Sequence, residues 1–262
     1  MNRIVIAVII VMLAITGLLL GCDELTKETI TGSGNLETTE FELSGFSKLD
    51  VSHSFEVAVN RSDSHSVSIT VDDNLLDYLD IKRSGDTLII HLDVGYNYRN
   101  TTQLATVTMP DLRSVGLSGA SVANIGAFSS NNPIDTRLSG SSSIDFEDLN
   151  AGDADFDLSG SSRITGSMRV SDCEFDLSGS SRITLDGSGD ELSAHASGSS
   201  RLNLDDFEVS DADIRLSGSS SATVNLSGTL DVSASGSSHL RYVGDPTLGD
   251  IDICESCSVT KK

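Results

Sequence analysis

The chain has 262 residues, with 23 glycines, 3 prolines and no tryptophan. Its 39 acidic residues outnumber its 17 basic residues and give a formal net charge of −22. A negative field of this size repels polyanions, so the binding of nucleic acid through a charged face is excluded. The same charge keeps a strand-rich protein soluble.

The first predicted element is a lipoprotein signal peptide over residues 1–21. Asn2 and Arg3 precede a 17-residue apolar run from Ile4 to Leu20, which a glycine and Cys22 follow. This order is typical of a signal after which the cysteine is acylated and anchors the protein to a membrane. The alternative is an uncleaved membrane anchor, since the run lies at the short limit for spanning a bilayer. Either form places the body outside the cytoplasm, in the cell envelope, where disulfides persist.

Residues 22–35 are polar and predict a flexible tether. Residues 36–110 predict irregular leading β coils, with a short helical turn after Val71. The segments with strand-like alternation are Phe55–Val59, Val67–Val71, Thr87–Leu92 and Ala105–Met109. No linker rich in glycine, proline or charge divides the chain, so residues 36–262 are expected to form a single body.

Residues 111–259 contain a repeated phrase, Leu-Ser-Gly-Ser-Ser or a close variant. The glycines of successive copies are 18 to 21 residues apart, at Gly119, Gly140, Gly160, Gly179, Gly198, Gly218 and Gly236. A fixed period of this size is the signature of a solenoid, in which each coil buries its apolar face only by stacking on its neighbours. Glycine accepts a positive φ, so the Ser-Gly-Ser-Ser phrase predicts a corner between two strands.

Each copy alternates apolar and polar residues before its glycine. Ala154, Phe156 and Leu158 are apolar in one copy, and the residues between them are aspartates. A period of two predicts a strand with one buried and one wet face. An apolar residue such as Ile164 returns four positions after the glycine and starts a second strand. The sequence therefore predicts an all-β parallel β-helix, a β-solenoid of the right-handed kind because its coil length varies.

The order of motifs along the chain resembles the head GIN domain family, over residues 40–259. The motifs that carry the resemblance are Phe46–Val51, Phe55–Val59, Val71–Leu79, Thr87–Ile90, Val107–Leu112 and Leu117-Ser-Gly119. Members of this family are called putative auto-transporter adhesins. The resemblance implies a secreted or lipid-anchored β-solenoid and supplies no agreed set of functional residues.

Three arginines occupy the same place, three residues after successive glycines: Arg163, Arg182 and Arg201. Stacked guanidinium groups could grip a uronic-acid chain or another polyanion. The alternative is that they pair on a solvated face with an acidic ladder formed by Asp155, Asp157, Glu174 and Asp176. Tyr96 and Tyr98, in a predicted loop, are the second candidate for ligand contact. The four tyrosines of the chain are expected to be too few and too dispersed to line an aromatic cleft.

Cysteine replaces corner serines in the last copy, at Cys254 and Cys257. This pair predicts a disulfide that closes the end of the solenoid, where strand edges are otherwise unpaired. A metal site would need a second pair of ligands. Cys173 aligns with Ala154 and is expected to be a buried core thiol.

These features favour an adhesin-like recognition module or surface scaffold, attached to the membrane through its lipid and in contact with a glycan or an envelope protein. The alternatives are a polysaccharide lyase or hydrolase on the same fold, and a purely structural envelope protein. The histidines are scattered and no coil carries a long loop, so no catalytic residue, metal or cofactor is predicted.

Overall fold

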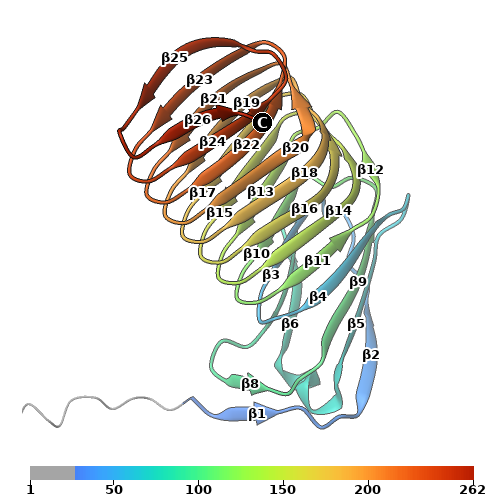
Figure 1. Ribbon diagram of the computed structural model, residues 1–262. Coiled ribbons are helices and arrows are strands. Elements are labelled where there is room, and N and C mark those ends of the chain that lie inside the picture. The colour runs from blue at the N-terminus through green and yellow to red at the C-terminus, as the bar shows by residue number, and fades with distance from the viewer. Residues whose placement is uncertain (1–26) are drawn as a thin grey trace, which may run out of the picture.

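The computed structural model describes residues 27–262. They form a β-solenoid of about seven turns, and the chain climbs from the N-terminal end to the C-terminal end coil by coil (Figure 1). The predicted signal peptide and Cys22 lie outside the described residues. Among residues 27–262, no helix has the length and apolarity that crossing a bilayer requires.

Two sheets form opposite walls of the solenoid. Sheet I has eleven strands, in the order β25 (Thr247–Ile253), β23 (Thr229–Ala234), β21 (Asp211–Leu216), β19 (Glu191–Ala196), β17 (Cys173–Leu177), β15 (Ala154–Leu158), β13 (Ile134–Leu138), β10 (Ser114–Leu117), β3 (Lys48–Val51), β7 (Thr87–Leu92) and β6 (Leu79–Ser84).

Sheet II has thirteen strands and contains the strands that follow the corners. Its order is β2 (Leu36–Phe41), β5 (Ser66–Asp72), β9 (Gln103–Met109), β4 (Glu56–Arg61), β11 (Val122–Ile125), β14 (Ser143–Asn150), β16 (Arg163–Arg169), β18 (Arg182–Ser188), β20 (Arg201–Val209), β22 (Ser221–Leu226), β24 (His239–Val243) and β26 (Ser258–Lys261), with β12 (Phe128–Ser129) beside β14.

The predicted alternation is confirmed, because the apolar residues before each glycine are buried between the two sheets. Ala154, Phe156 and Leu158 are buried, and so is Ile164 at the start of the next strand. Phe156 and Phe175 lie in register on neighbouring coils with their rings stacked, 5.1 Å between centroids. Burial of these rows provides the main stabilisation, since no single coil can cover its own apolar face.

The corners depend on glycine. Gly179 has a φ of +72°, and a Cβ built there would lie 2.6 Å from the carbonyl oxygen of Gly160 in the coil below. That oxygen accepts a hydrogen bond of 2.7 Å from the backbone N–H of Ser180. The second corner serine points inward, where the buried Ser181 hydroxyl donates to the carbonyl of Ser178 at 2.7 Å. Each corner therefore satisfies its own polar groups and those of its neighbour.

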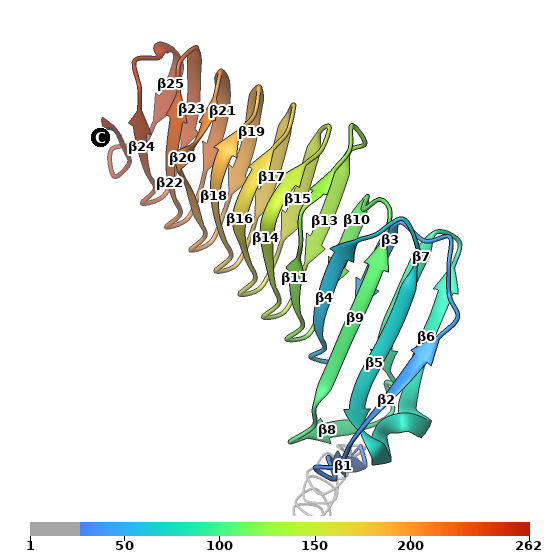
Figure 2. The same ribbon diagram turned by 90° about the vertical axis from the view of Figure 1, so that its right-hand side faces the viewer.

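The N-terminal end is built differently. After the first coil, β3–β4, the chain leaves the stack and forms β5, the short 3₁₀ helix η1 (Asp73–Tyr78) and β6, with both strands antiparallel to their neighbours. It then forms β7 and β9, which pair in parallel under β3 and β4. The antiparallel strands cover the lower end of the solenoid (Figure 2). The expected leading coils are thus two. The coil β7–β9 comes later in the chain but lies below the coil β3–β4, and the antiparallel strands β2, β5 and β6 cap this end.

Residues 27–35, which were predicted to belong to a flexible tether, are fixed to the folded body. Lys27 begins the described residues, and β1 (Thr29–Thr31) pairs in parallel with β8 (Asn97–Arg99). Ser33 and Gly34 are held by hydrogen bonds to the start of η1 and to Asp72. The expectation of a flexible segment up to residue 35 is therefore wrong for residues 27–35, because distant strand pairing fixes a sequence that is polar by composition.

Candidate functional site

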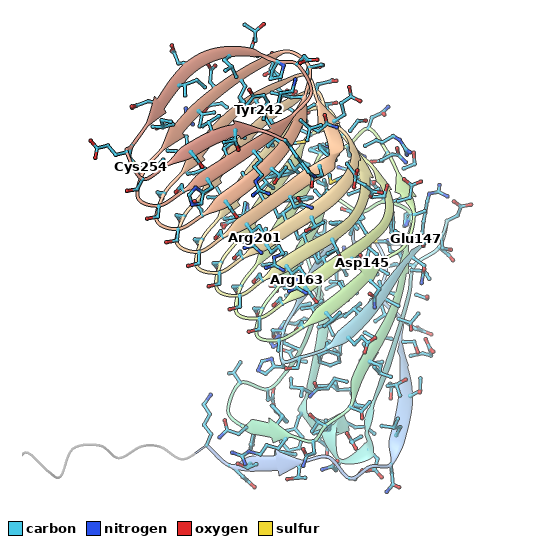
Figure 3. The ribbon with its side chains drawn as sticks, in the orientation of Figure 1. Asp145, Glu147, Arg163, Arg201, Tyr242 and Cys254 are labelled. Atoms are coloured by element: carbon cyan, nitrogen blue, oxygen red, sulfur yellow. A yellow bond between two sulfur atoms is a disulfide. The ribbon has the colours of Figure 1, made fainter. Side chains whose placement is uncertain are left out.

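The arginine ladder comprises Arg163, Arg182 and Arg201, the first residues of β16, β18 and β20. The three residues are in register on neighbouring parallel strands of sheet II. Neighbouring strands are about 4.8 Å apart, so the side chains leave the sheet at that interval. Arg163 and Arg201 project from the same sheet in Figure 3, on the face away from the core.

No carboxylate of the described residues neutralises the ladder. Among residues 27–262, no Asp or Glu oxygen lies within 4.0 Å of these three guanidinium groups, and the only side-chain hydrogen bond they make is the 3.3 Å bond from Arg201 Nε to the Ser221 hydroxyl. Five other arginines pair with aspartates: Arg61, Arg113, Arg137, Arg169 and Arg215. Three more arginines of residues 27–262 form no ion pair, but they are not stacked in one row: Arg83, Arg99 and Arg241. The ladder is thus a row of three positive charges without an ion-pair partner among the described residues of an acidic protein.

The expected pairing of the ladder with the acidic residues of the repeats is wrong. Asp155 and Asp157 lie on β15, and Glu174 and Asp176 lie on β17, both in sheet I. The arginines follow the corner and lie in sheet II. A corner separates the two sets because the chain changes sheet at each glycine.

Neutral polar side chains flank the ladder. The next outward row of sheet II contains Thr165, Thr184 and Asn203, in register on the same three strands. The Thr165 hydroxyl donates to Asp145, at 2.6 Å. Hydroxyl and amide groups beside a positive row can exchange hydrogen bonds with the hydroxyls of a sugar. Each of these residues lies two positions after a ladder arginine, so the strand alternation in the sequence could have identified them. They were not predicted.

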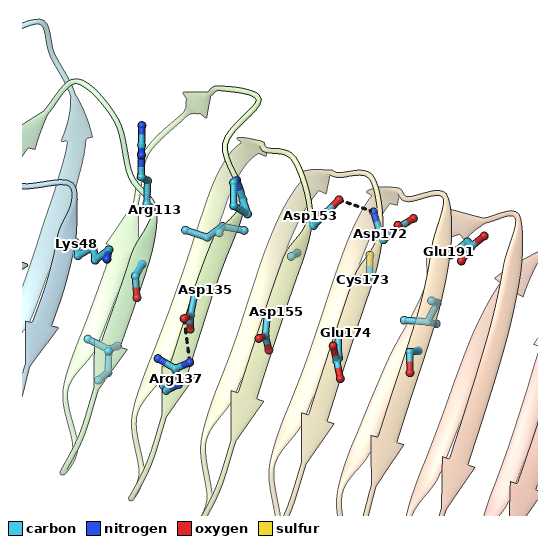
Figure 4. A pocket seen from close by; sticks show the side chains of 18 of the residues that line it. Lys48, Arg113, Asp135, Arg137, Asp153, Asp155, Asp172, Cys173, Glu174 and Glu191 are labelled. Carbon is cyan, nitrogen blue, oxygen red and sulfur yellow. Dashed lines mark hydrogen bonds and ion pairs between the residues drawn. The ribbon is translucent and has the colours of Figure 1, made fainter. Parts of the chain in front are cut away.

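The outer face of sheet I forms a long acidic groove of about 1410 Å³. Figure 4 shows Asp155 and Glu174 on neighbouring strands and Asp135 paired with Arg137, at 2.9 Å. Burial, followed by the nearby charges of Asp135 and Glu174, raises the pKa of Asp155 above its usual value. The groove therefore concentrates negative charge on the wall opposite the arginine ladder.

His195 links two charged residues on that wall. Its Nδ1 lies 3.2 Å from Asp176 Oδ1, and its Nε2 lies 2.6 Å from Arg215 Nη1. Because a guanidinium group can only donate, Nε2 accepts a hydrogen bond from Arg215 and the N–H at Nδ1 donates one to Asp176 Oδ1. Both ring nitrogens are occupied, so His195 is not free to act as a general base. Among residues 27–262, no group of three or more His, Cys, Asp or Glu side chains is arranged to hold a metal ion.

Three of the four tyrosines form one cluster, and Tyr242 lies apart on β24. Tyr78 and Tyr96 pack edge to face with 4.8 Å between ring centroids, and Tyr98 lies 6.2 Å from Tyr78. His53 joins this cluster through an edge contact with Tyr98. Tyr98 is on β8 rather than in a loop, and burial, together with nearby Asp93, raises its pKa to about 12. The sequence could not reveal this cluster, since its members come from η1, the loop before β8, β8 itself and the first corner.

The three cysteines of the described residues are of two kinds. Cys254 and Cys257 form a disulfide across the last corner. Cys173 is free and buried, in register with Ala154, and burial raises its pKa to about 12. A thiol with so high a pKa is almost wholly protonated at neutral pH, so Cys173 has the character of a core residue.

Comparison with known proteins agrees with this architecture. The family model described as "Putative auto-transporter adhesin, head GIN domain" matches residues 45–246. The chain belongs to the head GIN domain family. A search of curated proteins found no match.

Several solved structures share the head GIN fold of this chain. A putative lipid binding protein from Parabacteroides distasonis superposes with a TM-score of 0.79 at 23% identity, covering 90% of this chain and 100% of that one. A putative adhesin from Parabacteroides merdae gives a TM-score of 0.81 at 18% identity, covering 90% and 99%. A putative adhesin from Bacteroides fragilis gives 0.63 at 16% identity, covering 89% and 100%. At these identities the likeness establishes the fold alone.

Proposed function

We propose that this head GIN domain protein is a lipid-anchored recognition module of the cell envelope that binds a polyanionic glycan through its arginine ladder. The observation that carries the proposal is a row of three guanidinium groups in register, without carboxylate partners in the described part of the chain. Like charges on directly adjacent strands repel one another, so the row gives the isolated protein no stability. A bound polyanion would remove that repulsion.

A chain of uronic acids suits the ladder chemically. Each sugar of such a chain carries one carboxylate, so successive negative charges can meet successive guanidinium groups. Arginine holds a carboxylate in a planar, two-pronged geometry that lysine lacks. Thr184 and Asn203 lie one row away and can exchange hydrogen bonds with sugar hydroxyls. The acidic groove on the opposite wall repels the same ligand, which would restrict binding to sheet II.

The adhesin description of the family supports recognition over catalysis. The near-constant coil length leaves no broken coil in which a catalytic loop could sit, and His195 already engages Asp176 and Arg215. A carbohydrate-active enzyme remains the second candidate, and the binding assay includes a direct test for it.

The test compares the wild-type protein with a ladder variant, Arg163→Gln, Arg182→Gln and Arg201→Gln, titrated with polygalacturonate at low salt. The matched control is Arg113→Gln, Arg137→Gln and Arg215→Gln on sheet I, which changes the net charge equally. Losing at least about 1.4 kcal/mol from three exposed contacts weakens affinity about tenfold in the ladder variant. The control should bind as the wild type does.

Equal affinities for the two variants, or a wild type that binds neither polygalacturonate nor a sulfated glycan, would overturn the proposal. Dextran serves as the uncharged reference and should not bind. Release of unsaturated products or new reducing ends in the same samples would instead identify an enzyme. Circular dichroism of each variant checks that all three proteins are folded.

A further inference from the structure

We propose that the N-terminal pole of the solenoid rests on the membrane surface, with Val94 at the lipid headgroups. The pole consists of β1, η1, β8 and the loop Asp93–Tyr96 that joins β7 to β8. This inference rests on the lipid anchor at Cys22 in the proposed function, and it adds a second contact with the bilayer, made by the folded protein itself.

The first described residue, Lys27, lies directly beside this loop. Lys27 donates a hydrogen bond of 2.7 Å from Nζ to the carbonyl oxygen of Val94, and the N–H of Asn97 donates to the carbonyl of Glu28 at 2.8 Å. Lys27 is five residues after Cys22. Five residues span at most about 18 Å even when fully extended. An acylated Cys22 therefore keeps Lys27, and with it the loop, within about 18 Å of the headgroup region.

The loop presents the side chains that this region favours. Val94 is 67% exposed, the highest value among the large apolar residues of the described chain. Tyr96 follows two positions later and packs on Tyr78, with Tyr98 behind it. Tyrosine rings are enriched at membrane interfaces because they combine an apolar body with a polar tip. With a pKa of about 12, Tyr98 stays uncharged there.

The distribution of charge favours the same orientation. Residues 27–31 and 93–99 contain Lys27, Arg99, Glu28 and Asp93, so the two segments that meet at the loop have no net charge. The chain as a whole carries −22. With Asp73 and Asp77 of η1 the pole carries a net charge of −2, far less than the rest of the solenoid. An anionic lipid surface therefore repels the acidic coils more strongly than the pole, so the solenoid points away from the membrane. Its C-terminal end, at the opposite extreme of the molecule in Figure 2, becomes the distal end.

The absence of tryptophan allows a direct test. A single indole is introduced by Val94→Trp, and its matched control is Leu248→Trp on β25, a 50% exposed residue at the distal end. Each full acylated protein is reconstituted in phosphatidylethanolamine and phosphatidylglycerol vesicles, with and without brominated lipids. Because interfacial groups sit about 5–10 Å into the headgroup boundary, the indole at position 94 should lose at least about half of its emission. The indole at position 248 should be unaffected.

A second measurement avoids the introduced indole. In the unsubstituted protein, amide hydrogen exchange of residues 93–98 should slow at least about threefold on vesicles relative to the Cys22→Ser form in buffer. Exchange in β23 and β25 should not change.

Each outcome decides a separate point. Protein that floats with vesicles and is quenched at position 94 alone supports the membrane-facing pole. If the protein floats but the indole is quenched at neither position, or equally at both, the membrane-facing pole is overturned and the lipid anchor is still supported. If mass spectrometry finds no acyl group and the protein does not float with vesicles, both the lipid anchor and the membrane-facing pole are overturned.

Discussion

At the scale of single residues, the corner glycines determine whether coils can stack. Their positive φ favours glycine, and the approach of one coil's carbonyl to the next coil's Cα leaves no room for a methyl group. Gly34 separates these two effects, because it has a φ of +81° and no atom within 4 Å of the place that a Cβ would occupy. Gly179 combines the same backbone conformation with a 2.6 Å approach to the Gly160 carbonyl oxygen.

We therefore expect Gly179→Ala to destabilise the protein far more than Gly34→Ala. The left-handed conformation alone costs about 1–2 kcal/mol for a residue with a Cβ. The steric conflict at Gly179 should bring the total above about 3 kcal/mol, which is in the range of severe single substitutions. Urea denaturation of both variants measures the difference. Equal losses of stability would mean that the coils can separate locally without penalty.

At the scale of elements, neighbouring strands of sheet I contribute outward carboxylates to shared rows, as β13, β15 and β17 do. Asp155 on β15 stands between Asp135 on β13 and Glu174 on β17, in register. Its raised pKa means that the folded protein disfavours the ionised carboxylate more than the unfolded chain does. The stability it provides is present below the unfolded-state pKa and is lost as pH rises through the folded-state pKa.

Asp155→Asn should accordingly stabilise the protein at pH 7, by no more than about 0.5 kcal/mol because the site is exposed to solvent. The gain should disappear below the usual carboxyl pKa of 3.8, where Asp155 is protonated in both states. Thermal denaturation across this pH range provides the measurement. Asp63→Asn, at a side chain that is 98% exposed, controls for the change in net charge. A gain that persists at pH 3 would contradict the electrostatic explanation.

At the scale of the whole molecule, the two ends of the solenoid differ. Antiparallel strands cover the N-terminal end, whereas β25 and β26 leave apolar residues such as Ile251 and Ile253 partly exposed at the other. In the last corner a disulfide takes the place of the serine hydrogen bond found in every regular corner. Because each coil contacts only its neighbours, damage at this end should remain local.

Reduction of the Cys254–Cys257 disulfide should thus loosen the last coil without unfolding the rest. The closed loop is short, so the contribution to global stability is at most about 2 kcal/mol. Hydrogen exchange of β25 and β26 should accelerate, while that of β13–β19 stays unchanged. The double variant Cys254→Ser and Cys257→Ser controls for the reductant, and uniform acceleration along the solenoid would show that its coils unfold as one unit.

The regular coils could be predicted from the sequence because their determinants are local and periodic. Alternation at Phe156 and its equivalents identifies the strands and their inward faces, and the position of Arg163 relative to its glycine predicts the stacked row. The same positions also indicated that the ladder arginines and the repeat aspartates do not form ion pairs, since Asp155 precedes the corner and Arg163 follows it. The two therefore lie in different sheets, although both were expected on one solvated face.

The sequence alone determined that this protein is a β-solenoid with a glycine corner in each coil, because a repeated local pattern dictates both strand and turn. Only the tertiary structure decided which distant segments meet. The pairing of β1 with β8, the gathering of Tyr78, Tyr96 and Tyr98, and the insertion of one coil below another all depend on contacts between segments far apart in the chain. Such contacts are selected by the burial and hydrogen bonding of the complete fold, for which no periodic signal exists.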